Sequence, residues 1–76
     1  MEEMVLTKLK PHQTAVVKDI TGGYNAVQRL GAMGIRPGKK ITMISAHFWR
    51  GPVTILIDKA KIAIGHGMAQ KIMVEV

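Results

Sequence analysis

The sequence predicts a mainly β fold in which five short strands form a small, strongly bent sheet that closes into a barrel, with one short helix after the first strand. Three observations lead to this prediction. The chain has 76 residues, of which 47% are hydrophobic, which is enough for one core and too few for two. Most apolar residues fall in short segments with β-branched side chains or period-two alternation. Only one segment has a helical period.

The first strand and the helix are expected on either side of a glycine pair. Residues 14–20 are rich in β-branched side chains and predict the first strand, which ends at Gly22 and Gly23. From Tyr24 the apolar period becomes helical and predicts a helix of about ten residues, although Gly31 weakens its interior. The residues that set this period are Val27, Leu30 and Gly34.

Everything after the turn at residues 36–39 is predicted to be strand. Proline and glycine in that turn preset its backbone angles. A tight connection is expected at residues 58–60, and a break with a short turn at residues 65–69. No linker or repeat interrupts the chain, so residues 1–76 are expected to form a single domain. The four strands of this part are predicted at residues 40–46, 53–57, 61–64 and 71–76.

Strand alternation places two apolar side chains on faces that should be polar. Leu56 in the third strand and Met73 in the last strand both point away from the predicted core face. We expect the helix, or the N-terminal segment that contains Leu6 and Leu9, to cover them. If neither does, the two side chains form an exposed apolar patch, which is typical of a protein interface. Both are therefore candidate partner-binding residues.

The net charge of +6 is concentrated in the middle of the chain. Residues 21–50 contain five basic residues and no acidic residue, whereas residues 1–20 are neutral overall and residues 51–76 carry one net positive charge. A stretch of one sign indicates an anionic partner through electrostatic steering, and a solvated surface that keeps the chain in solution explains it equally well. The five basic residues are Arg29, Arg36, Lys39, Lys40 and Arg50.

The connection between the second and third strands holds two of the three aromatic residues of the chain. Its sequence is His47-Phe48-Trp49-Arg50. Aromatic residues beside an arginine on a loop are typical of an interface hot spot. We expect Phe48 to close one end of the barrel, and we take Trp49 and Arg50 as candidate partner contacts.

The chain lacks features that several functional classes need. It contains no cysteine, which excludes disulfides, zinc ribbons and thiol nucleophiles. Its uninterrupted apolar runs, such as residues 55–57, are far shorter than the roughly 18 residues of a membrane span. The first residues are acidic, unlike those of a secretory signal. We therefore expect a cytoplasmic protein without direct membrane insertion.

The sequence carries no complete nucleotide, metal or catalytic motif. Residues 38 and 39 lack both anchor positions of a phosphate-binding loop, and residues 65–70 lack the third glycine of the dinucleotide fingerprint. The only serine has no base to pair with it, so we expect no enzymatic activity. We also expect no cofactor and no metal ligands, and we leave open a ferrous or other transition metal ion. The histidines, which are far apart in sequence, are His12, His47 and His66.

Short motifs spread over nearly the whole chain form one set. They are Ala15-x-Val17-x-x-Ile20-x-Gly22-Gly23, Arg29-Leu30-x-x-Met33-Gly34-Ile35-x-Pro37-Gly38, Ile41-x-Met43, Gly51-Pro52-Val53, Ile62-Ala63-Ile64, Met68-Ala69 and Ile72-x-Val74. As a set they resemble the ferrous iron transport protein A (FeoA) family. Two positions depart from the family pattern: His12 stands where glycine usually follows the proline, and Gly51 stands where an acidic residue often precedes the next proline.

The resemblance implies an SH3-like β-barrel with a helix between the first two strands. It further implies a small cytoplasmic accessory protein of ferrous iron transport. The implied partner is FeoB, the membrane iron transporter with a cytoplasmic GTP-binding domain, which the accessory protein would bind and modulate. The same module resembles the SH3-like domain of DtxR-type metal-dependent repressors, so a stand-alone relative of that domain is an alternative.

Nucleic-acid binding is the main alternative from another class, since small barrels with basic faces often bind RNA or DNA. Base stacking needs aromatic residues on a strand face, whereas Tyr24 is expected on the helix and Trp49 in a loop, which argues against it. We therefore expect a non-catalytic binding module that its basic middle third steers to the transporter. An iron carrier and a weak homo-oligomer are left open.

Overall fold

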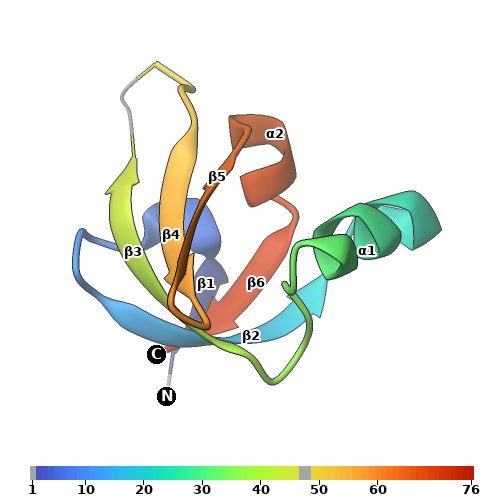
Figure 1. Ribbon diagram of the computed structural model, residues 1–76, viewed down its shortest axis with the longest axis horizontal. Coiled ribbons are helices and arrows are strands. Elements are labelled where there is room, and N and C mark those ends of the chain that lie inside the picture. The colour runs from blue at the N-terminus through green and yellow to red at the C-terminus, as the bar shows by residue number, and fades with distance from the viewer. Residues whose placement is uncertain (1, 47–48) are drawn as a thin grey trace.

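Six antiparallel strands form one bent sheet in the computed structural model, which describes residues 2–46 and 49–76. The order of strands across the sheet is β1-β6-β2-β3-β4-β5 (Figure 1). The strands are β1 (Glu3–Val5), β2 (Thr14–Ile20), β3 (Lys40–Ala46), β4 (Val53–Ile57), β5 (Ala60–Ile64) and β6 (Ile72–Glu75). The helical elements are η1 (Leu6–Lys8), α1 (Gly23–Ala32) and α2 (His66–Ala69).

The five predicted strands and the helix are confirmed with boundaries that differ by at most one or two residues. Sequence reasoning missed β1, which pairs with β6 from Glu3↔Glu75 to Val5↔Met73. Three residues are too few to show an alternating period, so the strand left no signal. The turn predicted at residues 65–69 is a single helical turn, α2, and a short helix η1 follows β1.

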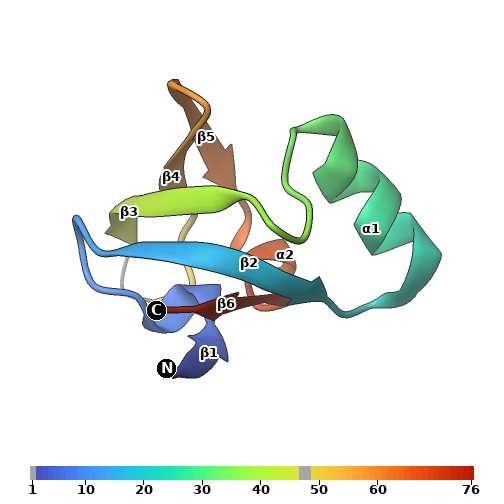
Figure 2. The ribbon, with the colours of Figure 1, turned by 90° about the horizontal axis from the view of Figure 1, so that it is seen from below.

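The predicted closure of the sheet into a barrel is wrong. β1 and β5 are the two ends of the strand order, and no pairing joins them among the residues that the structure describes. The sheet bends instead, with register shifts between Val17 and Asp19 against β6 and between Met43 and Ser45 against β4. Bulges of this kind increase the local twist. Figure 2 shows β4 and β5 rising from the layer that contains β2 and β6.

One hydrophobic core lies inside the bend of the sheet. Alternation along β4 and β6 buries every second residue, as predicted. Leu6 and Leu9 are also buried, so the segment around η1 closes one side of the core. No polar or charged residue is buried in the described parts of the chain. Apolar burial, at roughly 25 cal/mol per Å² removed from water, is therefore the main force that holds these elements together.

The C-terminal end of α1 is a Schellman turn that anchors the helix to the core. Gly34 has a φ of +86°, and its N–H donates to the Gly31 carbonyl at 2.9 Å. The Ile35 N–H donates to the Leu30 carbonyl at 3.0 Å, and both side chains are fully buried. This is the hydrogen-bond pattern of the motif, and buried hydrophobic residues occupy the two positions that usually contact one another. Gly34, which the sequence analysis counted in the helical stripe, therefore ends the helix.

The β4–β5 turn generates a stability prediction. Asp58 and Lys59 have φ values of +49° and +69°, and they connect the paired residues Ile57 and Ala60. A two-residue hairpin of this type favours glycine at its second position. We expect Lys59→Gly to raise the free energy of unfolding by about 0.5–1 kcal/mol, because glycine removes the left-handed strain. Urea denaturation measures the change.

Lys59→Ala is the matched control for this prediction. It removes the same charge but keeps a Cβ atom at the positive φ, so it should give no gain in stability. Equal midpoints for the glycine and alanine variants would show that the backbone of this turn is not strained.

Candidate docking surface on the protruding helix

Helix α1 leaves the end of β2 and protrudes from the sheet (Figures 1 and 2). Its inner side is apolar, because Ala26 and Leu30 are buried against the core. Its outer side is also partly apolar: Tyr24 and Val27 are 75% and 45% exposed, and Met33, which directly follows the helix, is 37% exposed. These three make up half of the large hydrophobic residues that are exposed in the described parts of the chain. Helix α1 thus carries a substantial share of the exposed apolar side chains.

A hollow of about 400 Å³ opens along the C-terminal half of α1. Gly31 contributes no side chain to it, and a Cβ atom built there would have Arg36 Nε, at 4.0 Å, as its nearest neighbour. The space above Gly31 is therefore open, and packing does not require a glycine at this position. The residues that line the hollow are Val27, Gln28, Gly31, Ala32 and Arg36.

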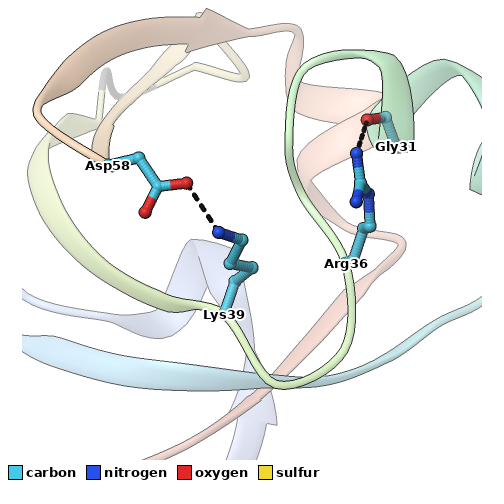
Figure 3. Close-up of polar contacts among 4 residues, drawn as sticks. All are labelled: Gly31, Arg36, Lys39 and Asp58. Carbon is cyan, nitrogen blue, oxygen red and sulfur yellow. Dashed lines mark hydrogen bonds and ion pairs between the residues drawn. The ribbon is translucent and has the colours of Figure 1, made fainter.

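Arg36 forms a positively charged rim beside this hollow. Its Nη2 donates to the Gly31 carbonyl at 3.3 Å, as Figure 3 shows. This carbonyl lies at the C-terminal end of α1, where the helix dipole favours a cation. Arg29 adds a second exposed cation in the last turn of α1. The hollow thus combines apolar lining with positive charge.

Lys39 lies close to this surface, but an acidic side chain from another part of the sequence partly neutralises it. Lys39 Nζ lies 2.7 Å from Asp58 Oδ2 in the β4–β5 turn (Figure 3). The basic middle third, which contains no acid in sequence, therefore meets one in space. Because the Lys39 and Asp58 side chains remain 38% and 65% exposed, solvent screens the pair and its contribution to stability is small.

The predicted partner contacts do not form one continuous surface. Lys40 is exposed at the start of β3, next to Lys39, whereas Trp49 and Arg50 follow the far end of that strand. Seven extended residues separate the two groups by roughly 20 Å. Trp49 is 97% exposed, and its role as a partner contact remains a prediction. His47 and Phe48 lie outside the described residues, and so does the expectation that Phe48 closes one end of a barrel.

Leu56 and Met73 contribute no exposed apolar patch. Both are half-buried. In the ladder Leu56 lies between residues of β3 and β5, and Met73 lies between residues of β1 and β2. Val5 thus lies beside Met73 within the sheet. Coverage of either side chain by α1 or by the segment that contains Leu6 and Leu9 stays a prediction.

The two histidines that the structure describes lie in a turn and at the start of a short helix. His12 is exposed with a φ of +71°, and its N–H donates to the Met43 carbonyl at 2.7 Å, so it takes the backbone conformation that glycine usually supplies there. His66 begins α2 and is half-buried. Within residues 2–46 and 49–76, no three His, Cys, Asp or Glu side chains lie together in a way that could hold a metal ion. The helices described in the same ranges are too short to cross a membrane.

Known proteins share both the sequence and the fold of this chain. A curated protein of Methanocaldococcus jannaschii, provisionally named Fe(2+) transport protein A, is 46% identical over 66 residues, which are 87% of this chain and 78% of the relative. The crystal structure of an iron uptake regulatory protein (FeoA) matches with a TM-score of 0.89 and 33% identity over 99% of this chain and 97% of that chain.

The structure of T. acidophilum IdeR matches the whole of this chain with a TM-score of 0.86 and 30% identity, but the match covers only 35% of IdeR. These likenesses confirm the predicted SH3-like fold, which here has an open sheet. Residues 4–76 match the family described as the FeoA domain. The chain therefore belongs to the FeoA domain family.

Proposed function

We propose that this chain binds the cytoplasmic part of a FeoB-type ferrous iron transporter and modulates its activity without catalysing a reaction itself. The single observation that carries the proposal is the hollow on α1, where exposed apolar side chains lie beside Arg36. Family membership supports the transport class, as does the iron-transport name of the M. jannaschii relative.

The chemistry of the hollow favours a protein partner with an acidic surface. Val27 and Ala32 offer apolar contact to an inserted side chain, and the missing side chain of Gly31 leaves room for it. Arg36 would attract negative charge around that side chain and speed the encounter, and Arg29 adds to the positive charge of α1. Apolar anchors inside a polar rim are the usual arrangement of a protein interface.

The positions of the exposed aromatic residues argue against nucleic acid as the partner. Tyr24 lies on α1 and Trp49 in the β3–β4 connection, so neither stands on a strand face among the described residues. A stacking platform needs aromatic side chains beside one another on such a face. The mixed apolar and basic surface of α1 therefore supports a protein partner better.

Reversing the charge at the rim of the hollow tests the steering role of Arg36. We expect Arg36→Glu to slow association with the purified cytoplasmic part of the transporter by about tenfold at low salt and to flatten its salt dependence. Stopped-flow mixing at several salt concentrations measures both effects. Lys10→Glu makes the same charge change at an exposed site before β2 and should have a smaller effect. Equal rates for the two variants would refute this docking surface.

Filling the hollow separates binding from stability. We expect Gly31→Leu to raise the free energy of unfolding by about 0.5–1 kcal/mol, because glycine is a poor helix residue and the site has room. The same variant should weaken transporter binding about tenfold, since its side chain occupies the space that the partner needs. Calorimetric titration and urea denaturation measure the two quantities. A more stable variant that binds as tightly as the wild type would contradict the proposal.

A further inference from the structure

Strand β5 is a free edge of the open sheet. It pairs with β4 from Val53↔Ile64 to Ile57↔Ala60, and no strand pairs with its other side in the described parts of the chain. Lys61 and Ala63 are exposed, so the sheet face that these two residues share is uncovered as well. In both Figure 1 and Figure 2 this edge faces the side of the molecule on which α1 protrudes.

The register of the hairpin identifies the backbone groups on this edge. In an antiparallel ladder, residue pairs alternate between hydrogen-bonded and non-hydrogen-bonded. A two-residue turn makes the flanking pair Ile57↔Ala60 hydrogen-bonded, so Ile55↔Ile62 is hydrogen-bonded as well. Lys61 and Ala63 therefore direct their N–H and C=O groups away from β4. These groups are available to a further strand.

The two edges of the sheet differ in how well they resist pairing. Natural proteins protect edge strands by shortening them, by bulges, by proline or by charge. β1 has only three residues and begins with the exposed Glu3. β5 has five residues, no proline and no register shift against β4, and Lys61 is its only charged residue. It is the edge better suited to accept another strand.

We propose that β5 is a docking edge for an extended acidic segment of a partner protein, which adds to the sheet as a strand alongside Lys61 and Ala63. Charge selects this occupant. Lys59 and Lys61 lie at the edge, and the nearby Asp58 is paired with Lys39. The net charge of +6 opposes a second copy of the chain at the same position. Ile62, which lies between Lys61 and Ala63, is half-buried and offers an apolar contact to the added strand.

This docking mode goes beyond the proposed function, because it defines a second surface by backbone pairing and does not depend on the identity of the transporter. Main-chain hydrogen bonds supply the affinity in such complexes, and alternate side chains supply the specificity. The preferred sequence would alternate acidic and apolar residues, with an acidic residue near Lys61.

Peptide titration followed by amide NMR tests the proposal. The probe is a capped eight-residue peptide that alternates glutamate and valine, and its control alternates lysine and valine. We expect the acidic peptide to shift the amide signals of residues 60–64 saturably, with a dissociation constant below about 1 mM, and the basic peptide to leave them unchanged. No saturable shift at Lys61 and Ala63 with about 2 mM acidic peptide overturns the proposal.

A proline variant tests the role of the backbone edge. Ala63→Pro removes an N–H that no strand uses, and proline is tolerated at such positions, so the variant should fold and lose peptide binding. Ile62→Pro is the matched control: it removes an inward N–H of the β4–β5 ladder and should lower the melting temperature far more. A folded Ala63→Pro variant that binds the acidic peptide like the wild type overturns strand addition.

A charge variant keeps the test decisive if Ala63→Pro does not fold. Lys61→Glu leaves the backbone unchanged and should weaken binding of the acidic peptide about two- to fivefold. Equal affinity for the acidic peptide in this variant overturns the choice of an acidic occupant. Sedimentation of the unliganded chain tests whether a second copy of the chain occupies this edge. A dimer that Ala63→Pro abolishes would assign the edge to that second copy and overturn the proposal.

Discussion

The burial of Leu30 and Ile35 is the constraint on which the proposed docking surface of this protein depends. The backbones of these two residues are joined by a hydrogen bond of the Schellman turn at the end of α1, and both side chains are completely excluded from solvent. The turn needs a left-handed residue, which Gly34 supplies. With this end of the helix held, Val27 and Arg36 are placed around a hollow that faces solvent. Losing the anchor would release the helix and its outer surface together.

The open sheet explains why the molecule offers a second surface. β1 adds to β6 at one end of the strand order, and the N-terminal segment then continues through η1 to bury Leu6 and Leu9. The chain therefore uses its first residues to close the core rather than to pair with β5. A closed barrel has no edges, whereas this arrangement leaves the edge of β5 uncovered. Because β1 pairs with β6 and not with β5, the backbone edge of β5 is left for the proposed strand addition.

The surroundings of the basic residues are the feature that the sequence predicted least well. The middle third of the sequence has no acidic residue, yet Lys39 meets Asp58, which is 19 positions away. No local pattern predicts this contact, because the pairing of β3 with β4 and the turn after β4 bring the two residues together. The structure places Arg36, one member of the basic run, beside apolar surface at the hollow, whereas Arg29 lies in the last turn of α1 and does not line it. The proposed role of Arg36 in binding therefore depends on the apolar residues around it, which the charge run alone does not reveal.

Local sequence patterns were sufficient to predict β2 to β6 and α1, because periodicity and turn residues act over a few positions. Alternation along β4 and β6 assigned their buried residues correctly, and the motif around Leu30 and Gly34 indicated the family. Other features arise only from tertiary contacts: the pairing of β1 with β6, the open edge of β5, and the half-burial of Met73. The tertiary structure also places Trp49 far from Lys40. These features depend on contacts between segments distant in sequence, whose formation local propensity does not encode.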